Sequence, residues 1–488
     1  MCYNLRMGAD HLLTRLREPS ELLLRLAGLS GAYIVGGWLR DAWWGNTSTD
    51  IDLAAPEPLS PVLDIIEQVL GTRPFELSSR FASHRLVAEG YTIDIMPLAE
   101  GGIQTDMMRR DYTINAIAVP LAKLGQNCTI ADISAHSKTL VDLDARCLRM
   151  VSRENLGDDP VRLLRGYRLA AHYGLTPTPD TRKAWGDLAP RLHGSAAERL
   201  HEELLRWFAC SDSLAETAEW CAVDGVLWQL FPALKDTVTS QQNDFHHLDV
   251  WQHTLAALNE LEAMLDKPPE LLAQWHGELA AAWEMPVSGA ASAGVLTRLA
   301  LLLHDIGKPP TRAVQPDGHV SFHQHQDVGA ELVAQDLARL SFAQSEQDFL
   351  LNMIREHLRL GFYSDHLPLS PRLVYRFANK LGAATPLMVL HSLADCAATR
   401  GSANAGSWEA HLSAAAIILE HYFAQDRVTA PPVLLDGNAI MGLLGIPPGP
   451  VVGELKETLL EATAAGDIET YADAEAFLSA LWEEKAGN

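Results

Sequence analysis

The stretch GGWLRDAWWGNTSTDID, residues 36–52, decides how the first part of this chain folds. The apolar run before it predicts a strand, Gly36 and Gly37 predict a tight turn into a short helix, and Asp50 and Asp52 predict the start of a second strand. Side chains alternate along a strand, so we expect both carboxylates on one face and the isoleucine between them in the core. A glycine turn lets the backbone approach a phosphate chain closely. The combination predicts a site of oxygen ligands suited to Mg²⁺.

A plainer interpretation of this stretch is a glycine turn followed by a solvated acidic strand end. Arg40 lies between the two features, and an arginine is a good phosphate ligand. The turn, the arginine and the acid pair together favour the functional interpretation. Such a site is suited to the transfer of a nucleotidyl group with the help of two metal ions.

Length and composition limit the class of protein. The 488 residues predict about two to four domains, and 48% hydrophobic with 20% charged residues is ordinary for a globular protein. Charged residues interrupt every apolar stretch before it reaches membrane-spanning length, and residues 1–30 do not fit a secretory signal. We therefore expect a cytoplasmic protein with no membrane partner. The six cysteines form no CxxC pair and are expected to be reduced thiols.

The net charge of −24 is unfavourable for general nucleic-acid binding, because contacts to phosphate require Lys and Arg. The charge is uneven, however, and residues 146–206 carry more Lys and Arg than Asp and Glu. A modest basic zone on an acidic body permits local binding of a structured RNA. It argues against a protein that coats nucleic acids generally.

Hydrophobic periodicity divides the chain into an α+β first part, up to about residue 150, and a mostly helical remainder. The first part is expected to contain helices and one hairpin, each bounded by turn residues. The expected elements are helices at residues 12–29, 61–70 and 108–119, and a hairpin at residues 86–96 with its turn at Glu89-Gly90.

Asp94 lies on the second strand of this predicted hairpin. Two interpretations are open for it. It is either a third acid that joins Asp50 and Asp52 from the adjacent strand, or a surface residue at a strand end.

The motifs GGWLRD and TDIDLA resemble the head-domain signature of the polymerase-β-type nucleotidyltransferases. More narrowly, they resemble the class II tRNA nucleotidyltransferase and bacterial poly(A) polymerase family. The resemblance implies a nucleotidyltransferase palm as the fold of the head, with Mg²⁺ held by Asp50 and Asp52. The implied ligands of the triphosphate are Gly36, Gly37 and Arg40.

RRDYTINAIA, residues 109–118, resembles the RRDFTINAMA block of this family, with Tyr112 in place of the usual phenylalanine. By this resemblance Arg110 contacts the triphosphate, Asp111 reads the ribose 2′-hydroxyl, and Asn115 supports both one helical turn later. The alternative is a charge cluster at a helix start, with Asp111 as its cap.

DDPVRLLRGYRLAAHYG, residues 158–174, resembles the EDPLRxLRAxRFAxxLG block of the family. The resemblance implies that Asp159 and Arg162 present hydrogen-bonding edges to the incoming C or A, as a protein template. Arg165 and Arg168 are the implied partners in the nucleotide site. Arg168 rotates away on an ideal helix, so a contact to the neck or the RNA backbone is the alternative for it. Asp159 precedes a proline and is also a good helix N-cap.

Class II enzymes that add a complete CCA end usually carry a long flexible loop between the strand of the third acid and RRD. Here the connection, IMPLAEGGIQTDMM at residues 95–108, is short and lacks the usual arginine after that strand. In the family, absence of the loop is associated with enzymes that add CC and stop before the terminal A. Both CC-only addition and full CCA addition, with a lever elsewhere, remain open.

A second set of motifs lies in the helical part of the chain: VWQHTL, LLLHDIGKP, FHQHQD, IREHL and LHSLAD. The order His, His-Asp, Asp resembles the HD metal-dependent phosphohydrolase superfamily. Such ligands suit Mn, Ni, Fe, Zn or Mg, and hydrolysis would use a metal-bound water, although some relatives keep the fold only as a scaffold. The implied ligands are His253, His304, Asp305 and Asp395, with His325 and His357 for a second metal or the substrate phosphate.

The segment from residue 434 onward, LLDGNAIMGLLGIPPGP, resembles the tail of the same family. The expected domains are a nucleotidyltransferase head (residues 1–150), a helical RNA-binding neck (151–240), an HD domain (241–405) and a helical tail (406–488). The expected function is addition of C and/or A from CTP and ATP to the 3′ end of tRNA. Two alternatives are a poly(A) polymerase of this family and an HD phosphohydrolase whose head only senses nucleotides.

Overall fold

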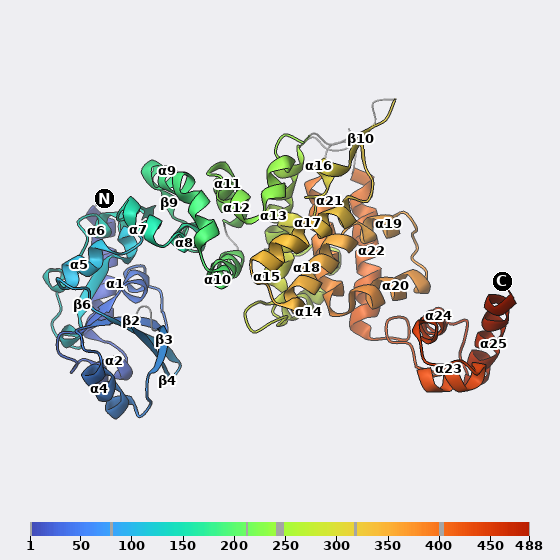
Figure 1. The fold of residues 1–488 in the computed structure, drawn as a ribbon, viewed down its shortest axis with the longest axis horizontal. Coiled ribbons are helices and arrows are strands. Elements are labelled where there is room, and N and C mark those ends of the chain that lie inside the picture. The colour runs from blue at the N-terminus through green and yellow to red at the C-terminus, as the bar shows by residue number, and fades with distance from the viewer. Residues whose placement is uncertain are drawn as a thin grey trace. The chain divides into compact units, whose positions relative to one another are not determined.

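The computed structural model describes residues 2–78, 82–210, 213–240, 248–316, 320–399 and 405–487. The chain divides into two compact units, and each is described by itself (Figure 1). The first unit comprises Met1–Glu203 and Val223–Gln229, and the second comprises Leu204–Ala222 and Leu230–Asn488.

The first unit contains a mixed sheet covered by helices and followed by a small group of helices (Figure 1). Its strands are β1 (Tyr33–Val35), β2 (Asp50–Ala55), β3 (Phe75–Ser78), β4 (Ser83–Ala88), β5 (Tyr91–Pro97), β6 (Ile117–Pro120), β7 (Ser134–Ala135), β8 (Cys147–Leu148) and β9 (Thr176–Pro177). Its α-helices are α1 (Cys2–Arg17), α2 (Glu21–Leu26), α3 (Gly37–Trp43), α4 (Ser60–Leu70), α5 (Ile103–Met108), α6 (Thr139–Asp144), α7 (Arg153–Asp158), α8 (Val161–Tyr173), α9 (Pro179–Leu188) and the first part of α10 (Ala197–Phe208). Its 3₁₀-helices are η1 (Thr113–Asn115), η2 (Leu121–Lys123), η3 (Ile130–Asp132) and η4 (Ala189–Gly194).

The main sheet has the strand order β3-β4-β5-β2-β1-β6-β7. Strands β2 and β5 run parallel, and the other neighbouring pairs are antiparallel. Alternate residues of the central strands, Ile51, Leu53, Ile93 and Ile95, are buried, as expected for a sheet whose inner face lies on a core. The two acids that begin β2 therefore lie in the middle of the sheet.

Two of the predicted elements of the head are confirmed and two are wrong. A helix covers residues 61–70 as predicted, and the hairpin turns at Glu89 and Gly90, which have φ angles of 52° and 80°. The predicted helix at residues 12–29 is broken into α1 and α2, because Pro19 cannot continue a helix and Ser20 caps the next one.

The predicted helix at residues 108–119 is also wrong. Helix α5 ends at Met108, and the chain then forms the single turn η1 and strand β6. Pairing with β1, for example Val35 with Ala118, overrides the local helical pattern, because β6 is buried in the sheet.

The remaining helices border or form the second unit, which contains the HD motifs (Figure 1). They are α11 (Leu214–Val223), α12 (Leu227–Leu230), α13 (Val250–Asp266), α14 (His276–Trp283), α15 (Ala293–Leu303), α16 (Lys308–Thr311), α17 (His325–Arg339), α18 (Gln344–Glu356), α19 (Arg359–Ser364), α20 (Pro371–Leu381), α21 (Thr385–Ala398), α22 (Ala405–Ala424), α23 (Gly437–Leu444), α24 (Pro450–Ala465) and α25 (Tyr471–Gly487). Three 3₁₀-helices, η5 (Pro232–Thr237), η6 (Glu270–Trp275) and η7 (Gly382–Ala384), and a hairpin of β10 (Arg312–Val314) and β11 (Val320–Phe322) complete this part.

Helix α13 packs on α21, and α15 packs on both α18 and α21. The segment Pro371–Ala398 is long and apolar enough to cross a membrane, but it consists of α20 and α21 and 78% of its most apolar window is buried within the protein, as in core helices. Helices α23 to α25 share a separate small core around Ile440, Leu455 and Leu478. The fold class expected from the sequence, an α+β head followed by a helical body and tail, is confirmed.

Candidate functional site

The bend after β1 lies directly against the acid strand. Gly36 has a φ of 73°, a conformation that favours glycine. A Cβ on Gly36 would lie 3.4 Å from Oδ2 of Asp52 and 3.1 Å from Nη1 of Arg110. The structure thus brings the bend, one acid of β2 and the arginine of RRD together. Gly37 follows as the first residue of the two-turn helix α3.

The two acids of β2 differ in exposure. Asp50 is exposed, Ile51 is buried, and Asp52 is half-buried, so the alternation along the strand is as predicted. Burial raises the pKa of Asp52, and the charge of Asp94 adds to this effect, while Arg110 and other arginines oppose it. An ionised Asp52 is therefore incompletely compensated by the protein, which is the condition that a bound cation relieves.

Asp94 lies next to Asp52 in the sheet, because β5 pairs with β2 in a register that joins these two residues. Its carboxylate accepts two hydrogen bonds from Arg85, from Nε at 2.7 Å and from Nη2 at 2.8 Å. It is therefore in the middle of a strand, not at a strand end. The sequence analysis missed Arg85, although counting back from the Glu89-Gly90 turn would have placed it opposite Asp94.

Arg110 and Asp111 do not begin a helix, contrary to the prediction. Arg110 donates to Oδ1 of Asp106 through Nε at 3.1 Å and Nη2 at 2.9 Å, which leaves Nη1 towards Gly36. Asp111 accepts from the backbone N–H of Tyr112 at 2.7 Å and from Nδ2 of Asn115 at 3.0 Å. Burial favours a higher pKa for Asp111, but nearby arginines and these hydrogen bonds outweigh it, and the pKa is lowered. Asp111 is a buried, ionised acceptor.

Arg40 is buried and fully engaged by protein groups. Nε donates to Asp41 at 3.0 Å, Nη1 donates to Oδ1 of Asn115 at 2.7 Å, and Nη2 donates to the hydroxyl of Tyr173. The guanidinium also lies over the Tyr173 ring, 4.3 Å from its centre. The structure thus links Arg40 to Asn115 and, through it, to Asp111. Tyr173 is a residue that the sequence analysis missed.

The predicted base-reading residues lie where α7 gives way to α8. Asp159 directly follows α7 as its C-cap, and the N-cap position of α8 belongs to Pro160, so the predicted capping role of Asp159 is wrong. Both oxygens of Asp159 accept from Arg199 of α10, at 2.9 and 2.8 Å. Arg162 donates through Nη1 to the backbone oxygens of Arg109, at 3.2 Å, and Asn155, at 2.9 Å.

Arg165 and Arg168 share one partner. Their Nε atoms donate to the two oxygens of Glu203, at 3.0 and 2.8 Å respectively, and Nη1 of Arg165 lies 3.3 Å from Oδ2 of Asp111. Arg165 therefore belongs to the group around Asp111, whereas Arg168 is held beside α10. Glu203 and Arg199 were missed because both lie far along the chain from the residues they contact.

The HD motifs converge in the second unit. Among the described residues, two groups have donor atoms within 4.8 Å of one another: His253, His304 and Asp395, and Asp305, His325 and His357. Asp305 lies between the groups, since its Oδ2 is 3.2 Å from Nε2 of His304 and its Oδ1 is 3.4 Å from Nε2 of His325. The sequence analysis missed Lys308, whose Nζ is 2.7 Å from Oδ2 of Asp305.

Three of these histidines share one arrangement. His304, His325 and His357 each direct Nδ1 to the backbone oxygen of the residue three positions earlier, at 2.7–2.8 Å. A carbonyl only accepts, so each Nδ1 carries a proton, and Nε2 is the nitrogen of each ring that can bind a metal once it is unprotonated. Nε2 of His325 lies only 3.2 Å from Nε2 of His357. Two bare nitrogens at this distance require a proton or a cation between them, and the donor set fits a divalent metal.

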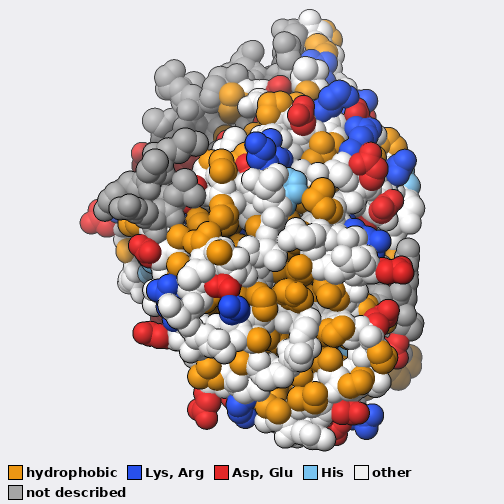
Figure 2. Space-filling view, turned by 90° about the vertical axis from the view of Figure 1, so that its left-hand side faces the viewer, with side chains coloured by type: hydrophobic (Ala, Val, Ile, Leu, Met, Phe, Trp, Pro, Cys, Tyr) orange, Lys and Arg blue, Asp and Glu red, His pale blue; other side chains and the backbone are white. Residues whose placement is uncertain are grey.

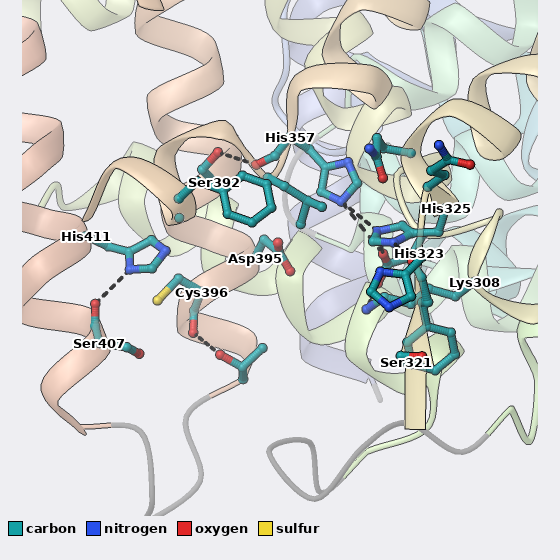
Figure 3. A pocket seen from close by; sticks show the side chains of 18 of the residues that line it. Lys308, Ser321, His323, His325, His357, Ser392, Asp395, Cys396, Ser407 and His411 are labelled. Atoms are coloured by element: carbon teal, nitrogen blue, oxygen red, sulfur yellow. Dashed lines mark hydrogen bonds and ion pairs between the residues drawn. The ribbon is translucent and has the colours of Figure 1, made fainter. Parts of the chain in front are cut away.

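A pocket of about 570 Å³ opens beside these groups. In Figure 3, Asp395 lies between His325, His357 and Lys308 on one side and Cys396 and His411 on the other. The pocket volume lies within the range of about 300–1,000 Å³ that is usual for small-molecule sites.

Comparison with protein families identifies two regions of the chain. Residues 250–387 match the model of the HD domain, and residues 174–237 match that of the probable RNA and SrmB-binding site of polymerase A. Solved structures share the fold: a Thermotoga maritima CCA-adding enzyme complexed with tRNA has a TM-score of 0.59 at 19% identity, over 97% of this chain and 98% of that one. A CCA-adding enzyme in complex with ATP has a TM-score of 0.62 at 18% identity, over 96% of each chain.

The curated relatives are more similar in sequence. An A-adding tRNA nucleotidyltransferase of Deinococcus radiodurans is 33% identical over 94% of this chain and 97% of its own length. A CC-adding tRNA nucleotidyltransferase of Thermus thermophilus is also 33% identical, over 92% of this chain and 93% of its own. Identity at this level along nearly the whole length of both chains shows that this protein belongs to the tRNA nucleotidyltransferase family.

Proposed function

We propose that this protein adds C and/or A from CTP and ATP to the 3′ end of tRNA, without a nucleic-acid template. The observation that carries the proposal is the meeting of Gly36, Asp52 and Arg110 within a few ångströms. A glycine bend whose backbone can approach a phosphate, an arginine and an incompletely compensated carboxylate are the parts that nucleotidyl transfer requires.

Asp50 and Asp52 are the proposed ligands of Mg²⁺, with Asp94 as a helper once it leaves Arg85. A magnesium ion held there would neutralise the triphosphate and lower the pKa of the attacking hydroxyl. Arg110, whose Nη1 faces the bend, binds the triphosphate. The 3′-hydroxyl of the RNA attacks the α-phosphate, the new P–O bond forms, and pyrophosphate leaves with the electron pair of the broken bond.

Arg40 supports this centre indirectly. Its guanidinium is already bound by Asp41, Asn115 and Tyr173, so it reaches the triphosphate only by giving up one of these partners. In the proposed function it fixes Asn115, which in turn orients Asp111. Asp111 then accepts a hydrogen bond from the ribose 2′-hydroxyl, which distinguishes ribonucleotides from deoxyribonucleotides.

Asp159 and Arg162 are the proposed readers of the base. Cytosine and adenine both present an amino group beside an unprotonated ring nitrogen, which matches one acceptor beside one donor. Arg165 and Arg168 stabilise this region through Glu203. Residues 174–237 of the neck are the proposed contact for the tRNA.

The number of nucleotides that the enzyme adds to the tRNA is a separate part of the proposal. The connection before RRD is compact: Leu98 and Ile103 pack around buried Met107 in a small core under β1 and β6. The connection contains no long flexible loop. Because absence of that loop is associated with CC addition in the family, we favour an enzyme that adds CC and stops. The two relatives described above carry the complementary names, A-adding and CC-adding, at equal identity.

The test is incubation of tRNA that ends at the discriminator base, or at CC, with CTP, ATP or both. We expect growth by two residues with CTP alone on the first substrate. Addition of one A to the CC end, or of CCA with both nucleotides, would support the family assignment with a different product. A long tail of A on unstructured RNA would indicate a poly(A) polymerase, and no incorporation would contradict the proposal.

The HD centre favours a second function, metal-dependent phosphoester hydrolysis. The facing Nε2 atoms of His325 and His357 and the bridging position of Asp305 provide ligands for two divalent ions, among Mn, Ni, Fe, Zn and Mg. The test is elemental analysis of the purified protein, with turnover of 2′,3′-cyclic nucleotides in the presence of each metal. A protein that holds no metal and hydrolyses none of them has a structural HD domain.

A further inference from the structure

One histidine of the pocket beside the HD centre has no role in the account so far. His411 is on α22, which packs against α19 and α21, and it lines the same pocket as the metal-ligand candidates. It lies outside residues 250–387, which match the HD model. In Figure 3, Asp395 lies between His411 and the histidines of the second metal group. The pocket therefore has a metal side and an opposite side, and His411 borders the opposite side.

The ring of His411 is oriented through Nδ1. This atom lies 2.7 Å from the backbone oxygen of Ser407 and 3.3 Å from Oγ of Ser364. The hydroxyl of Ser364 already donates to the backbone oxygen of Gly361 at 2.7 Å, so both neighbours of Nδ1 accept from it. Nδ1 therefore carries a proton in either charge state of the ring. The proton that His411 can give away is the one on Nε2.

A glycine leaves Nε2 of His411 uncovered. A Cβ on Gly361, in α19, would lie 3.2 Å from Nε2. No hydrogen bond to Nε2 is present within the described part of the chain, and in Figure 3 the ring points towards Cys396 and Asp395. The neighbouring Phe362 also lines the pocket and is 62% exposed. A ring nitrogen able to act on a ligand thus lies beside an aromatic surface that suits the apolar part of a nucleoside.

Hydrolysis of a phosphoester requires different groups on the two sides of the phosphorus atom. The proposed metal ligands place the phosphate and the attacking water on the metal side of the pocket. In-line displacement then directs the leaving oxygen away from the metal side, which is towards His411. The oxygen of an alcohol is a poor leaving group unless it receives a proton as the bond breaks.

We propose that His411 is a catalytic residue of the hydrolytic function and donates the proton on Nε2 to the leaving oxygen of a nucleoside phosphoester. The inference rests on the proposed hydrolysis at the HD centre. Water bonds to phosphorus and loses a proton to solvent. The bond from phosphorus to the ester oxygen breaks with its electron pair on that oxygen, and Nε2 of His411 supplies the proton that completes the hydroxyl. Solvent then protonates His411 again.

The first test compares the wild type with His411→Ala on two kinds of ester, with the metal that gives the highest turnover. A 2′,3′-cyclic nucleotide releases an alcohol oxygen that needs a proton, whereas a 4-nitrophenyl ester of a nucleotide releases a weakly basic phenolate that does not. We expect His411→Ala to lower kcat on the cyclic nucleotide about 100-fold or more, and to keep kcat on the 4-nitrophenyl ester close to the wild-type value. An unchanged kcat on the cyclic nucleotide, or an equal loss on both esters, overturns the inference.

The second test needs neither metal nor turnover. Diethyl pyrocarbonate acylates accessible ring nitrogens of histidine, and mass spectrometry of the modified metal-free protein reports the extent at His411. We expect modification of His411 in the wild type and loss of most of it in Gly361→Ala, whose methyl group covers Nε2. Gly361→Ala should also lose turnover of the cyclic nucleotide as His411→Ala does. An unmodified His411 in the wild type contradicts the proposed access of Nε2 to the pocket.

The matched control is His323→Ala, because His323 is an exposed histidine that lines the same pocket but lies near Lys308, on the metal side (Figure 3). It is expected to keep the wild-type kcat on both esters. Elemental analysis should find the wild-type metal content in His411→Ala, and loss of metal there would show a structural role and overturn the inference. Absence of both metal and turnover in the wild type contradicts the proposed hydrolysis itself.

Discussion

The hydroxyl of Tyr112 lies where a side chain on Gly166 would have to be, because a Cβ there would come within 2.2 Å of it. The hydroxyl donates to the backbone oxygen of Arg162 at 2.8 Å and accepts from Nε1 of Trp185 at 2.9 Å. The family blocks that these segments resemble carry phenylalanine and alanine at the two positions. Compared with those blocks, this chain has the larger Tyr112 on the RRD segment and the smaller Gly166 on α8. The hydroxyl of Tyr112 fills the space beside Gly166 and connects α8 to the RRD segment by a hydrogen bond.

The first prediction concerns this pair. Gly166→Ala is expected to lower the free energy of unfolding by about 1–3 kcal/mol through overpacking, partly offset by about 1 kcal/mol of helix propensity. Tyr112→Phe is expected to cost about 1–3 kcal/mol, because it leaves the partners of the hydroxyl unpaired. The double variant is expected to cost less than the sum, although Trp185, whose ring lies 2.5 Å from the same Cβ position, must also move. Denaturant unfolding of the three variants measures the coupling, and strict additivity would contradict the account.

The second prediction concerns Asp52. Its folded pKa is raised above 3.8, mainly by burial, so the folded chain binds this proton more tightly than the unfolded chain does. Stability is therefore lost as pH rises through the folded pKa, and the ionised carboxylate destabilises the metal-free protein at neutral pH. Asp52→Asn should raise the Tm of metal-free protein while incorporation falls at least about 100-fold.

Asp50→Asn is the control for this prediction, because Asp50 is exposed. It should lose incorporation without a gain in Tm. Thermal melts with and without Mg²⁺ provide the measurement, and Mg²⁺ should stabilise the wild type more than either variant. A lower Tm for metal-free Asp52→Asn would contradict the prediction, because it would show that the ionised carboxylate stabilises the protein even without metal.

The third prediction concerns Arg85 and Asp94. Both oxygens of Asp94 are bound by Arg85, so the arginine and a metal ion compete for the same carboxylate. Arg85→Ala should lower the Mg²⁺ concentration for half-maximal incorporation, by up to about fivefold for a partly exposed pair, and Asp94→Asn should raise it. A Mg²⁺ titration of both variants decides. If Arg85→Ala needs more Mg²⁺ than the wild type, the ion pair between Arg85 and Asp94 stabilises the pairing of β4 with β5 and does not compete with the metal.

The fourth prediction concerns the HD centre. Burial favours a lower pKa for His304, but Asp305 and Asp395 outweigh burial and raise its pKa to about 10 without metal. Metal must therefore displace this proton, and apparent affinity should rise up to about tenfold per pH unit between about pH 6 and pH 9. Calorimetry in buffers of different ionisation enthalpy measures the protons released. A pH-independent affinity would contradict this arrangement.

His304→Ala is the matching variant for the HD centre. It should abolish metal content but leave incorporation on tRNA at the wild-type rate, because the two centres lie in separate compact units. Loss of both activities would show that the HD domain supports the transferase.

The features that could be predicted from the sequence are those determined by residues close together in the chain. The acids of β2 and the hairpin turn at Glu89-Gly90 follow from alternation and turn chemistry over a few residues. Counting from that turn also places Arg85 opposite Asp94. The HD ligands were found as motifs because each is a chemically distinctive residue type.

The rest depended on contacts between distant segments. Residues 112–119 have a pattern compatible with a helix, and only burial of β6 beside β1 makes part of them a strand. Nothing near Asp159 indicates that Arg199 will bind it, since the two meet through the packing of α10 beside α8. On the side that Figure 2 views, Lys and Arg are interspersed with Asp and Glu.

The central claim is that Asp50 and Asp52 hold magnesium under a triphosphate at the Gly36 bend. The most direct measurement is single-turnover incorporation of one labelled nucleotide into tRNA by the wild type, Asp50→Ala and Asp52→Ala, at saturating Mg²⁺, with HD metal content as the check on folding. The account predicts that both variants keep their HD metal and lose at least about 100-fold in incorporation rate. Wild-type rates in either correctly folded variant would contradict it.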